Sequence, residues 1–303
     1  MDSVVRIQMM GNYLIFVDER KVENPVSKSR KGAALMSFLI LNGGHQVPNQ
    51  RLLRALWPGN TATNPENALK TLVSRVRSML NQIADGLGGC VVSDRGAYHW
   101  ENKPWVKIDL NEITEIFADL ARERDEAVLE DCYRRLLELY KGDLYQTGDL
   151  DKEAAYAEQL HGQYLSAMYD YIELLKRGEK YNEISAVCRT ALEVDSFDDH
   201  LHIELMKAMV NLNRTSDALS QYKYATNMTY RYLGAERSAF FVPSDLEQRL
   251  ATSGSRERYQ VQFERFGKMD VPDSRLLPLV SLLHRHQKGY DQEGYITGSD
   301  NYE

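Results

Sequence analysis

The chain has 303 residues, of which 43% are hydrophobic and 27% charged, with a formal net charge of −7. This composition is that of an ordinary folded protein with room for two domains, and it excludes an intrinsically disordered chain. The longest apolar run, residues 33–41, is too short to cross a bilayer, and the N-terminus lacks the residue order of a secretory signal. We therefore expect a cytoplasmic protein with no membrane partner.

Charge is distributed unevenly along the chain. Residues 1–105 contain 13 Lys/Arg and 8 Asp/Glu, a net +5, whereas the remainder contains 24 and 36, a net −12. A basic first third suggests that this part meets a polyanion and that the acidic remainder does not. Cys90, Cys132 and Cys188 are widely spaced, which fits a reducing compartment rather than a disulfide framework or a zinc site.

The first hundred residues read as short strands, then helices, then a hairpin. Strands are expected at residues 4–10, 13–17 and near 21–23. Helices are expected at residues 29–41, 49–57 and 65–80. The hairpin strands are expected at residues 90–93 and 97–100. This order predicts an α+β winged helix-turn-helix domain over residues 1–105, whose third helix enters the major groove and whose hairpin is the wing. The alternative is a small α+β domain with a structural hairpin.

The third expected helix has an unusual outward face. Asn64 can cap its start, and Pro65 suits its first turn. Apolar residues at helical spacing form one narrow stripe: Leu69, Leu72, Val73, Val76 and Leu80. An ordinary surface helix mixes acids and bases on its outer face, but here the only acid is Glu66, at the start. Bases, amides and hydroxyls are the groups that meet phosphates and base edges, although a solvated face could also lack acids.

Helical geometry separates two sets of candidate DNA contacts. The side opposite the stripe supplies the candidate base readers, which are Asn67, Lys70, Thr71, Ser74 and Ser78. Basic residues that flank this side, open the first helix or tip the hairpin are the candidate phosphate contacts, namely Arg75, Arg77, Arg30, Lys31 and Arg95.

From residue 107 the strand signals vanish, and apolar residues and tyrosines recur at helical spacing. Residues 177–184 align with residues 211–218 at an offset of 34, which is the period of the tetratricopeptide repeat. A more degenerate helix pair is expected at residues 110–140. We therefore expect residues 107–240 to form an all-α, tetratricopeptide-like domain of stacked helix pairs with a concave face.

The last part, residues 241–303, is less informative. Short helices are expected at residues 243–250 and 276–286. The end of the chain is Gly-rich and acidic without periodicity, so we expect a helical extension followed by a flexible tail or linker.

No catalytic constellation is apparent in the sequence. The histidine pairs His200/His202 and His284/His286 are each two residues apart, a spacing that on a helix points the rings to different sides rather than to a shared metal. The glycine-rich run at residues 86–89 resembles a phosphate loop, but no Lys-Ser/Thr follows it, so a flexible turn is expected. We expect neither an enzyme nor a bound cofactor or metal.

Several motifs occur together. Ser74-Arg75-Val76-Arg77 stands inside the third helix, and Leu56-Trp57-Pro58 precedes it. Further along, residues 139–144 read Leu-Tyr-Lys-Gly-Asp-Leu. Over about residues 4–240 this combination resembles the SARP-like bacterial transcription activators, which join an OmpR-type winged helix to a bacterial transcriptional activation domain. The family's wing motif Gly-Tyr-x-Leu is here replaced by Ala-Tyr-His-Trp at residues 97–100.

The resemblance implies a sequence-specific transcription regulator, most simply an activator. It would bind double-stranded promoter DNA through the 65–80 helix and the wing, engage RNA polymerase or another partner through the repeat domain, and act as a homo-oligomer on DNA. One alternative is a regulator whose repeat groove binds a signal peptide or protein that controls DNA binding. Another, an enzyme with a DNA-binding appendage, requires that the natural chain continues past Glu303.

Overall fold

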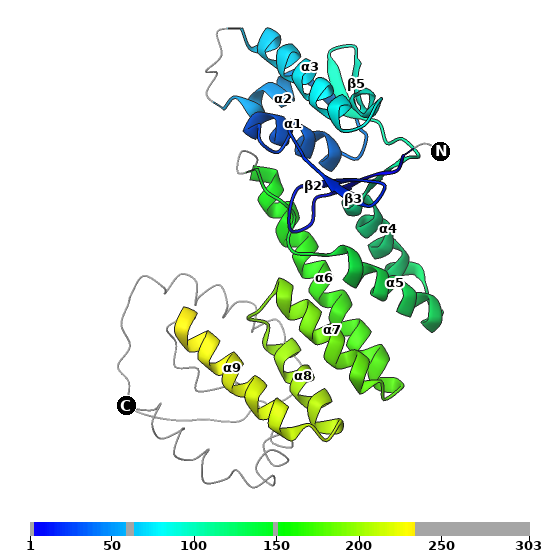
Figure 1. The fold of residues 1–303 in the computed structure, drawn as a ribbon, viewed down its shortest axis with the longest axis vertical. Helices are drawn as coiled ribbons and strands as arrows, with labels where there is room; N and C mark the ends of the chain where they lie inside the picture. Colours follow the sequence, from blue (N-terminus) through cyan, green and yellow to red (C-terminus); the bar gives the residue numbers. More distant parts are fainter. Residues whose placement is uncertain (1–2, 59–63, 148–150, 234–303) are drawn as a thin grey trace, which may run out of the picture. The chain divides into compact units, whose positions relative to one another are not determined.

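The computed structural model describes residues 3–58, 64–147 and 151–233. By internal contacts the chain divides into two compact units, residues 1–196 and residues 197–303. The first unit begins with strands and helices and continues into further helices, and the second contains a helical hairpin (Figure 1). The expected helical extension and tail at 241–303 lie outside the described residues.

A four-stranded sheet opens the first unit, in the order β3-β2-β1-β7. The expected strands are present as β1 (Val5–Gln8), β2 (Leu14–Val17) and β3 (Arg20–Val22). Strand β2 pairs antiparallel with both β1 and β3. The fourth strand, β7 (Val106–Ile108), pairs in parallel with β1. Strand β7 was not expected from the sequence, because three residues are too few for a period-two pattern to show. The sheet therefore crosses the boundary expected near residue 105.

Three helices form the core of the winged-helix part. They are α1 (Arg30–Leu41), α2 (Asn49–Leu56) and α3 (Pro65–Ile83). In α1 every residue from Gly32 to Ile40 is buried, as expected of a helix that is apolar on all sides. Helix α3 packs on both α1 and α2. It continues one turn beyond the expected end at Leu80, so its exposed face is longer than the sequence pattern indicated.

The wing is a hairpin of β5 (Val91–Asp94) and β6 (Ala97–Trp100), joined by two residues. Arg95 and Gly96 occupy the turn with φ angles of +40° and +84°, the two left-handed positions of a type I′ turn. A short strand, β4 (Val47–Pro48), pairs with β6 and was not expected from the sequence. The glycine-rich run before the wing forms a turn, and Leu87–Cys90 is a 3₁₀ helix within it.

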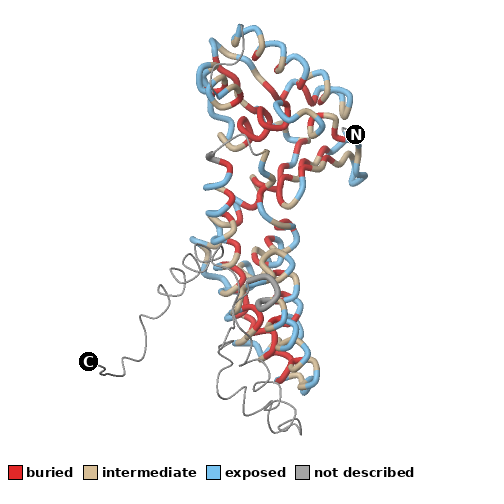
Figure 2. The backbone as a smooth tube through the Cα atoms, turned by 90° about the vertical axis from the view of Figure 1, so that its left-hand side faces the viewer, coloured by how far each residue is buried: buried red, intermediate tan, exposed pale blue. Residues whose placement is uncertain are grey.

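Four helices complete the first unit: α4 (Asp109–Arg122), α5 (Glu126–Leu139), α6 (Asp151–Arg177) and α7 (Tyr181–Val194). The pair α4 and α5 confirms the helix pair expected at residues 110–140. Stacked tyrosines pack α5 against α6. Tyr133 of α5 stacks on Tyr171 of α6 with 5.1 Å between ring centroids, and Tyr140, which follows α5, stacks on Tyr164 of α6 at 4.1 Å. Buried and exposed stretches alternate along these helices, as expected when one face is packed (Figure 2).

The second unit contains α8 (Asp199–Asn211) and α9 (Thr215–Leu233), which pack on each other. The 34-residue offset expected from the sequence recurs in backbone geometry. Glu179 and Asn213, 34 positions apart, both have left-handed φ angles, of +52° and +59°. In both turns the next residue's N–H bonds back across the helix end, to the carbonyl oxygen of Leu175 or Met209, which is the Schellman motif. The turns that end α6 and α8 therefore have the same backbone geometry, as the 34-residue repeat predicts.

Among the described residues, no helix combines the length and apolarity needed to cross a membrane.

Candidate nucleic-acid interface

Helix α3 presents the expected face to solvent. Asn64 caps the helix by accepting a hydrogen bond from the Asn67 N–H at 3.1 Å, and Pro65 occupies the first turn. Leu69, Val73 and Val76 are buried against the rest of the domain. The five candidate base readers are all exposed, and they are Asn67, Lys70, Thr71, Ser74 and Ser78. The apolar stripe therefore orients the polar face outward.

Most of these candidates share one hollow. An open hollow of about 700 Å³ runs along the outer side of α3, and its lining residues are Pro25, Lys70, Thr71, Ser74, Arg75, Ser78, Met79 and Gln82. Four of the five candidate base readers and one candidate phosphate contact therefore line the same surface. Asn67 lies outside it. Gln82 was missed because the helix was expected to end at Leu80, yet its amide is a group that can pair with a base edge.

The polar side chains on the exposed face of α3 differ in whether they already form a hydrogen bond within the helix. The Thr71 hydroxyl donates a 2.8 Å hydrogen bond to the Asn67 carbonyl oxygen, one turn back in the same helix. Its proton is thus already used, and the hydroxyl can offer a partner only an acceptor. Lys70 and Ser74 are therefore stronger candidates for base contact than Thr71.

Arg77 is oriented toward the wing. Its side chain is half-buried, and its Nε donates a 2.8 Å hydrogen bond to the carbonyl oxygen of Val91, the first residue of β5. Nearby, Asn81 Oδ1 accepts a 2.7 Å hydrogen bond from the Gly88 N–H. Both bonds tie α3 to the segment that leads into the wing. From the sequence we expected Arg77 to contact phosphate. Its half-burial against β5 depends on the tertiary structure, so helical spacing alone could not predict it.

The wing tip is fixed relative to α2. The Gly96 carbonyl oxygen accepts a 2.9 Å hydrogen bond from the N–H of Asn49, the first residue of α2. At the other side of the turn, Gln46 Nε2 donates to Asp94 Oδ2 at 2.8 Å. Arg95 is exposed at the tip, with its backbone held by these neighbours. A cation on a fixed hairpin beside α3 is suited to contact phosphate.

Two further candidate phosphate contacts begin α1. Ser29 Oγ caps this helix by accepting from the Gly32 N–H at 3.2 Å, and Arg30 and Lys31 are exposed in its first turn. The Lys31 ammonium lies 4.2 Å from the centre of the Trp57 ring, a cation–π contact that directs this side chain across the end of α2. The basic candidates therefore come from the start of α1, from α3 and from the wing.

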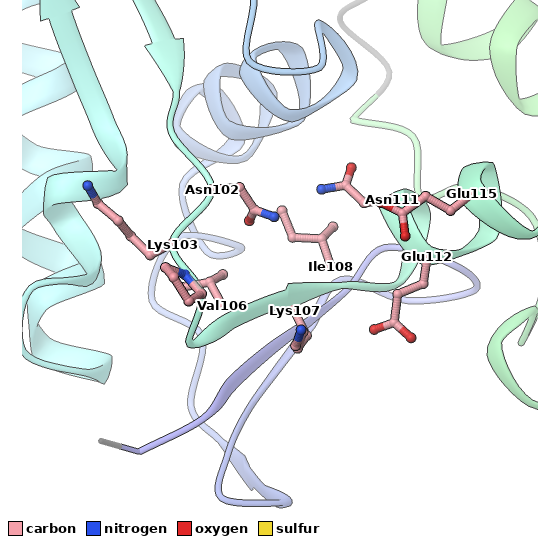
Figure 3. Close-up of a pocket in the computed structure, with 9 residues that line it drawn as sticks. Asn102, Lys103, Val106, Lys107, Ile108, Asn111, Glu112 and Glu115 are labelled. Atoms are coloured by element: carbon pink, nitrogen blue, oxygen red, sulfur yellow. The ribbon is translucent and has the colours of Figure 1, made fainter. Parts of the chain in front are cut away.

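A smaller polar pocket of about 240 Å³ lies where the wing leads into α4 (Figure 3). Asn102 and Lys103 border it from the segment before β7, and Asn111, Glu112 and Glu115 border it from α4. Two of its charged groups are paired, since Lys103 pairs with Glu101 at 2.7 Å and Arg135 pairs with Glu112 at 2.9 Å.

The histidines do not form a shared site. His200 is exposed, whereas His202 is buried with its Nδ1 2.9 Å from Gln221 Nε2, so the two rings lie on different sides of α8. His284 and His286 lie outside the described residues. Within the part of the chain that the structure describes, no three His, Cys, Asp or Glu side chains are grouped so that they could hold a metal ion.

Comparisons with known proteins match both parts of the chain. Residues 23–91 match the family described as "Transcriptional regulatory protein, C terminal", and residues 109–241 match "Bacterial transcriptional activator domain". A solved structure, "Mycobacterium tuberculosis EmbR in complex with low affinity phosphopeptide", shares the fold with a TM-score of 0.56 at 17% identity. The match covers 83% of this chain and 66% of that chain. No curated protein matches the sequence.

Proposed function

The chain belongs to the SARP-like bacterial transcription activators, since it joins the winged-helix domain of transcriptional regulatory proteins to a bacterial transcriptional activator domain, and from this we propose how it acts. The protein binds promoter DNA in a sequence-specific way through α3 and the wing. The helices from α4 to α9 then engage RNA polymerase or another protein partner. We place this activity in the cytoplasm, where bacterial promoters lie, and propose no catalysis.

The observation that carries this proposal is the hollow along α3. Lys70, Ser74 and Arg75 come together there on a helix whose only acid is Glu66, in the first turn. The buried stripe fixes the helix so that this face alone is presented. A rigid helix that offers ammonium, hydroxyl and guanidinium groups along one side fits the donor and acceptor pattern of the major groove. The basic groups at Arg95 and at the start of α1 would hold the phosphates beside it.

The proposed partner surface rests on charge and repeat geometry. Residues beyond 105 carry a net charge of −12, which opposes contact with a phosphate backbone. Stacked helix pairs of this kind present long helical surfaces suited to protein partners. We therefore propose that this part contacts polymerase and that two or more copies bind side by side on DNA.

The test is a genome-wide binding footprint of the tagged full-length protein, compared with that of a Lys70→Ala, Ser74→Ala double variant. We expect discrete promoter sites for the wild type and loss of these sites for the variant. Lys223→Ala is a matched control, because it removes one exposed lysine from α9 instead. Equal footprints for the wild type and the double variant would show that α3 is not the reader.

A second candidate function is signal sensing, in which a peptide or protein bound by the repeat helices controls DNA binding. It is motivated by the repeat hairpins and by the EmbR structure, which was solved with a phosphopeptide. The two functions differ in a simple way. Purified protein that binds its promoter fully without any added factor supports the first, and protein that binds only after a peptide or protein from the native lysate is added supports the second.

A further inference from the structure

The turn between β1 and β2 is joined to the loop that follows α5. The Gly11 N–H donates to the Asp143 carbonyl oxygen at 2.8 Å, and the Tyr145 N–H donates to the Met9 carbonyl oxygen at 2.8 Å. Met10 and Leu144 lie opposite each other as an isolated antiparallel bridge. These bonds form a short ladder between the winged-helix part and the helical part. We call this contact the junction, and it comprises residues 9–11, Asp109 and residues 141–145.

Two glycines allow the junction to close. Gly11 has a φ angle of +78°, and a methyl group on its Cα would lie 2.6 Å from the Lys141 carbonyl oxygen. From the other side, a methyl group on Gly142 would lie 3.1 Å from the Gly11 Cα. Atoms this close cannot be accommodated without movement of the backbone, because both neighbours are main chain. The two backbones therefore meet at a distance that only glycine permits.

The Asp109 side chain also holds the junction, through hydrogen bonds to the two residues that follow β1. Its carboxylate is buried and accepts hydrogen bonds at 2.9 Å from the N–H groups of Met9 and Met10, and one at 2.7 Å from Leu110. Asp109 is the first residue of α4, directly after β7, which itself pairs with β1. The carboxylate thus links the end of β1 to the start of the helical part. A bond of this kind to a charged acceptor is among the stronger ones.

The loop on the helical side is itself anchored. Asp143 Oδ1 lies 2.7 Å from His161 Nδ1 on α6 and accepts a 3.2 Å hydrogen bond from the Tyr140 hydroxyl. Its backbone carbonyl is the one that receives the Gly11 N–H. One residue therefore connects α6, the end of α5 and the turn of the DNA-binding part. The winged-helix part and α4 to α6 are held as one body rather than joined by a free linker.

From this geometry we propose that the junction is a positioning element for activation, and that Gly11 and Asp109 are its positioning residues. The proposal rests on the proposed function, in which one part binds the promoter and the other binds a partner. A fixed connection holds the partner-binding helices in one direction from bound DNA. Contact with polymerase then costs less orientational freedom than it would through a flexible tether.

The test uses the full-length Gly11→Ala variant and measures promoter affinity and transcription separately. Gly43→Ala is the matched control, because Gly43 also has a left-handed φ angle, of +58°, but no atom lies within 4 Å of an added methyl group. We expect Gly11→Ala to bind promoter DNA within about two-fold of the wild type and to activate a reconstituted polymerase about ten-fold less. The control should match the wild type in both measurements.

Hydrogen exchange at the amides of Gly11 and Tyr145 reports whether the junction has opened. Fast exchange together with full activation would overturn the proposal, and fast exchange with lost activation at retained DNA affinity would support it. Should Gly11→Ala fail to fold, Asp109→Ala gives a second opening, since it removes the acceptor of the Met9 and Met10 N–H groups. Failure of the proposed function would look different, because the wild type itself would then neither bind nor activate its promoter.

Discussion

Arg77 on α3 donates from Nε to the carbonyl oxygen of Val91, the residue with which the wing begins. The helix that carries the candidate base readers is thereby bonded to the first strand of the hairpin whose turn carries Arg95. Because this bond joins α3 to the wing, we expect its loss to disturb both halves of the proposed DNA interface.

Arg77→Ala should therefore lower stability. A half-buried hydrogen bond from a charged donor contributes about 1.5–3 kcal/mol, so we expect a loss in that range in the free energy of unfolding. Denaturant unfolding followed by circular dichroism measures it. Arg54→Ala, which removes an exposed arginine of α2, should change stability by less than about 0.5 kcal/mol. An Arg77→Ala variant as stable as the wild type would leave phosphate contact as the better role for this side chain.

Base reading should be unequal along α3. Lys70→Ala is expected to cost about 1–3 kcal/mol on the cognate site and to relax preference at one or two base pairs. Thr71→Ala should cost less than Ser74→Ala, because the Thr71 hydroxyl proton is bound to the Asn67 carbonyl. Binding measured against a library of site variants gives both quantities. Equal costs for Thr71→Ala and Ser74→Ala would contradict the ranking.

Arg95 should act on all sequences alike. If the wing tip contacts one phosphate, Arg95→Ala lowers the slope of log affinity against log salt by about one and leaves sequence preference unchanged. Titrations at several salt concentrations measure this slope. Arg189→Ala, at an exposed cation of α7, is the control and should leave the slope as it is. An unchanged slope in Arg95→Ala would remove the wing tip from the interface.

His161 should stay protonated well above neutrality. Its hydrogen bonds to Asp143 and, more weakly, to Asp195 raise the pKa of the ring to about 10 from its ordinary 6.5. A raised pKa in the folded state favours folding below about pH 6.5, and this contribution is lost as the pH rises through about 10. By nuclear magnetic resonance, one histidine signal should remain in its protonated position at pH 8.5 and be missing in His161→Gln. A wild type whose histidines are all neutral at pH 8.5 would rule this out.

Asp109 should make stability fall as the pH rises through the acidic range. Burial raises the pKa of this carboxyl to about 6 from 3.8, against the three backbone N–H bonds, which lower it. The folded state holds the proton more tightly, so the group favours folding below about pH 4 and loses that contribution by about pH 6. Relative to Asp109→Asn, the wild type should lose up to about 3 kcal/mol between pH 4 and 6.5. Unfolding curves that run parallel for the two proteins over this range would contradict the prediction.

Local pattern was enough to predict much of the fold. The apolar stripe from Leu69 to Leu80 placed α3, the turn residues Arg95 and Gly96 placed the wing, and the 34-residue offset placed the repeat helices. The signals for α3 and the wing lie within the segments that they specify, and the repeat signal comes from comparing two segments 34 residues apart. The exposed face of α3 followed directly from the same periodicity.

The features that the sequence did not reveal depend on contacts between distant segments. Strands β4 and β7 have two and three residues and exist because partners are available to them. The role of Arg77 depends on where β5 passes, and that of Gly11 on the approach of Lys141 and Gly142. That the Asp109 carboxylate reaches the end of β1 likewise depends on the tertiary structure. The assignments of base and phosphate contacts remain predictions.

The parallel pairing of β7 with β1 bears on how such regulators could be recombined. A chimera that takes its DNA-binding half from one protein and its activating half from another would need to cross over after Ile108, so that the DNA-binding half keeps its own fourth strand. Even then Gly11 would face a foreign loop in place of Lys141 and Gly142. Successful exchange should therefore require that the short segment from Lys141 to Tyr145 travels with the DNA-binding half.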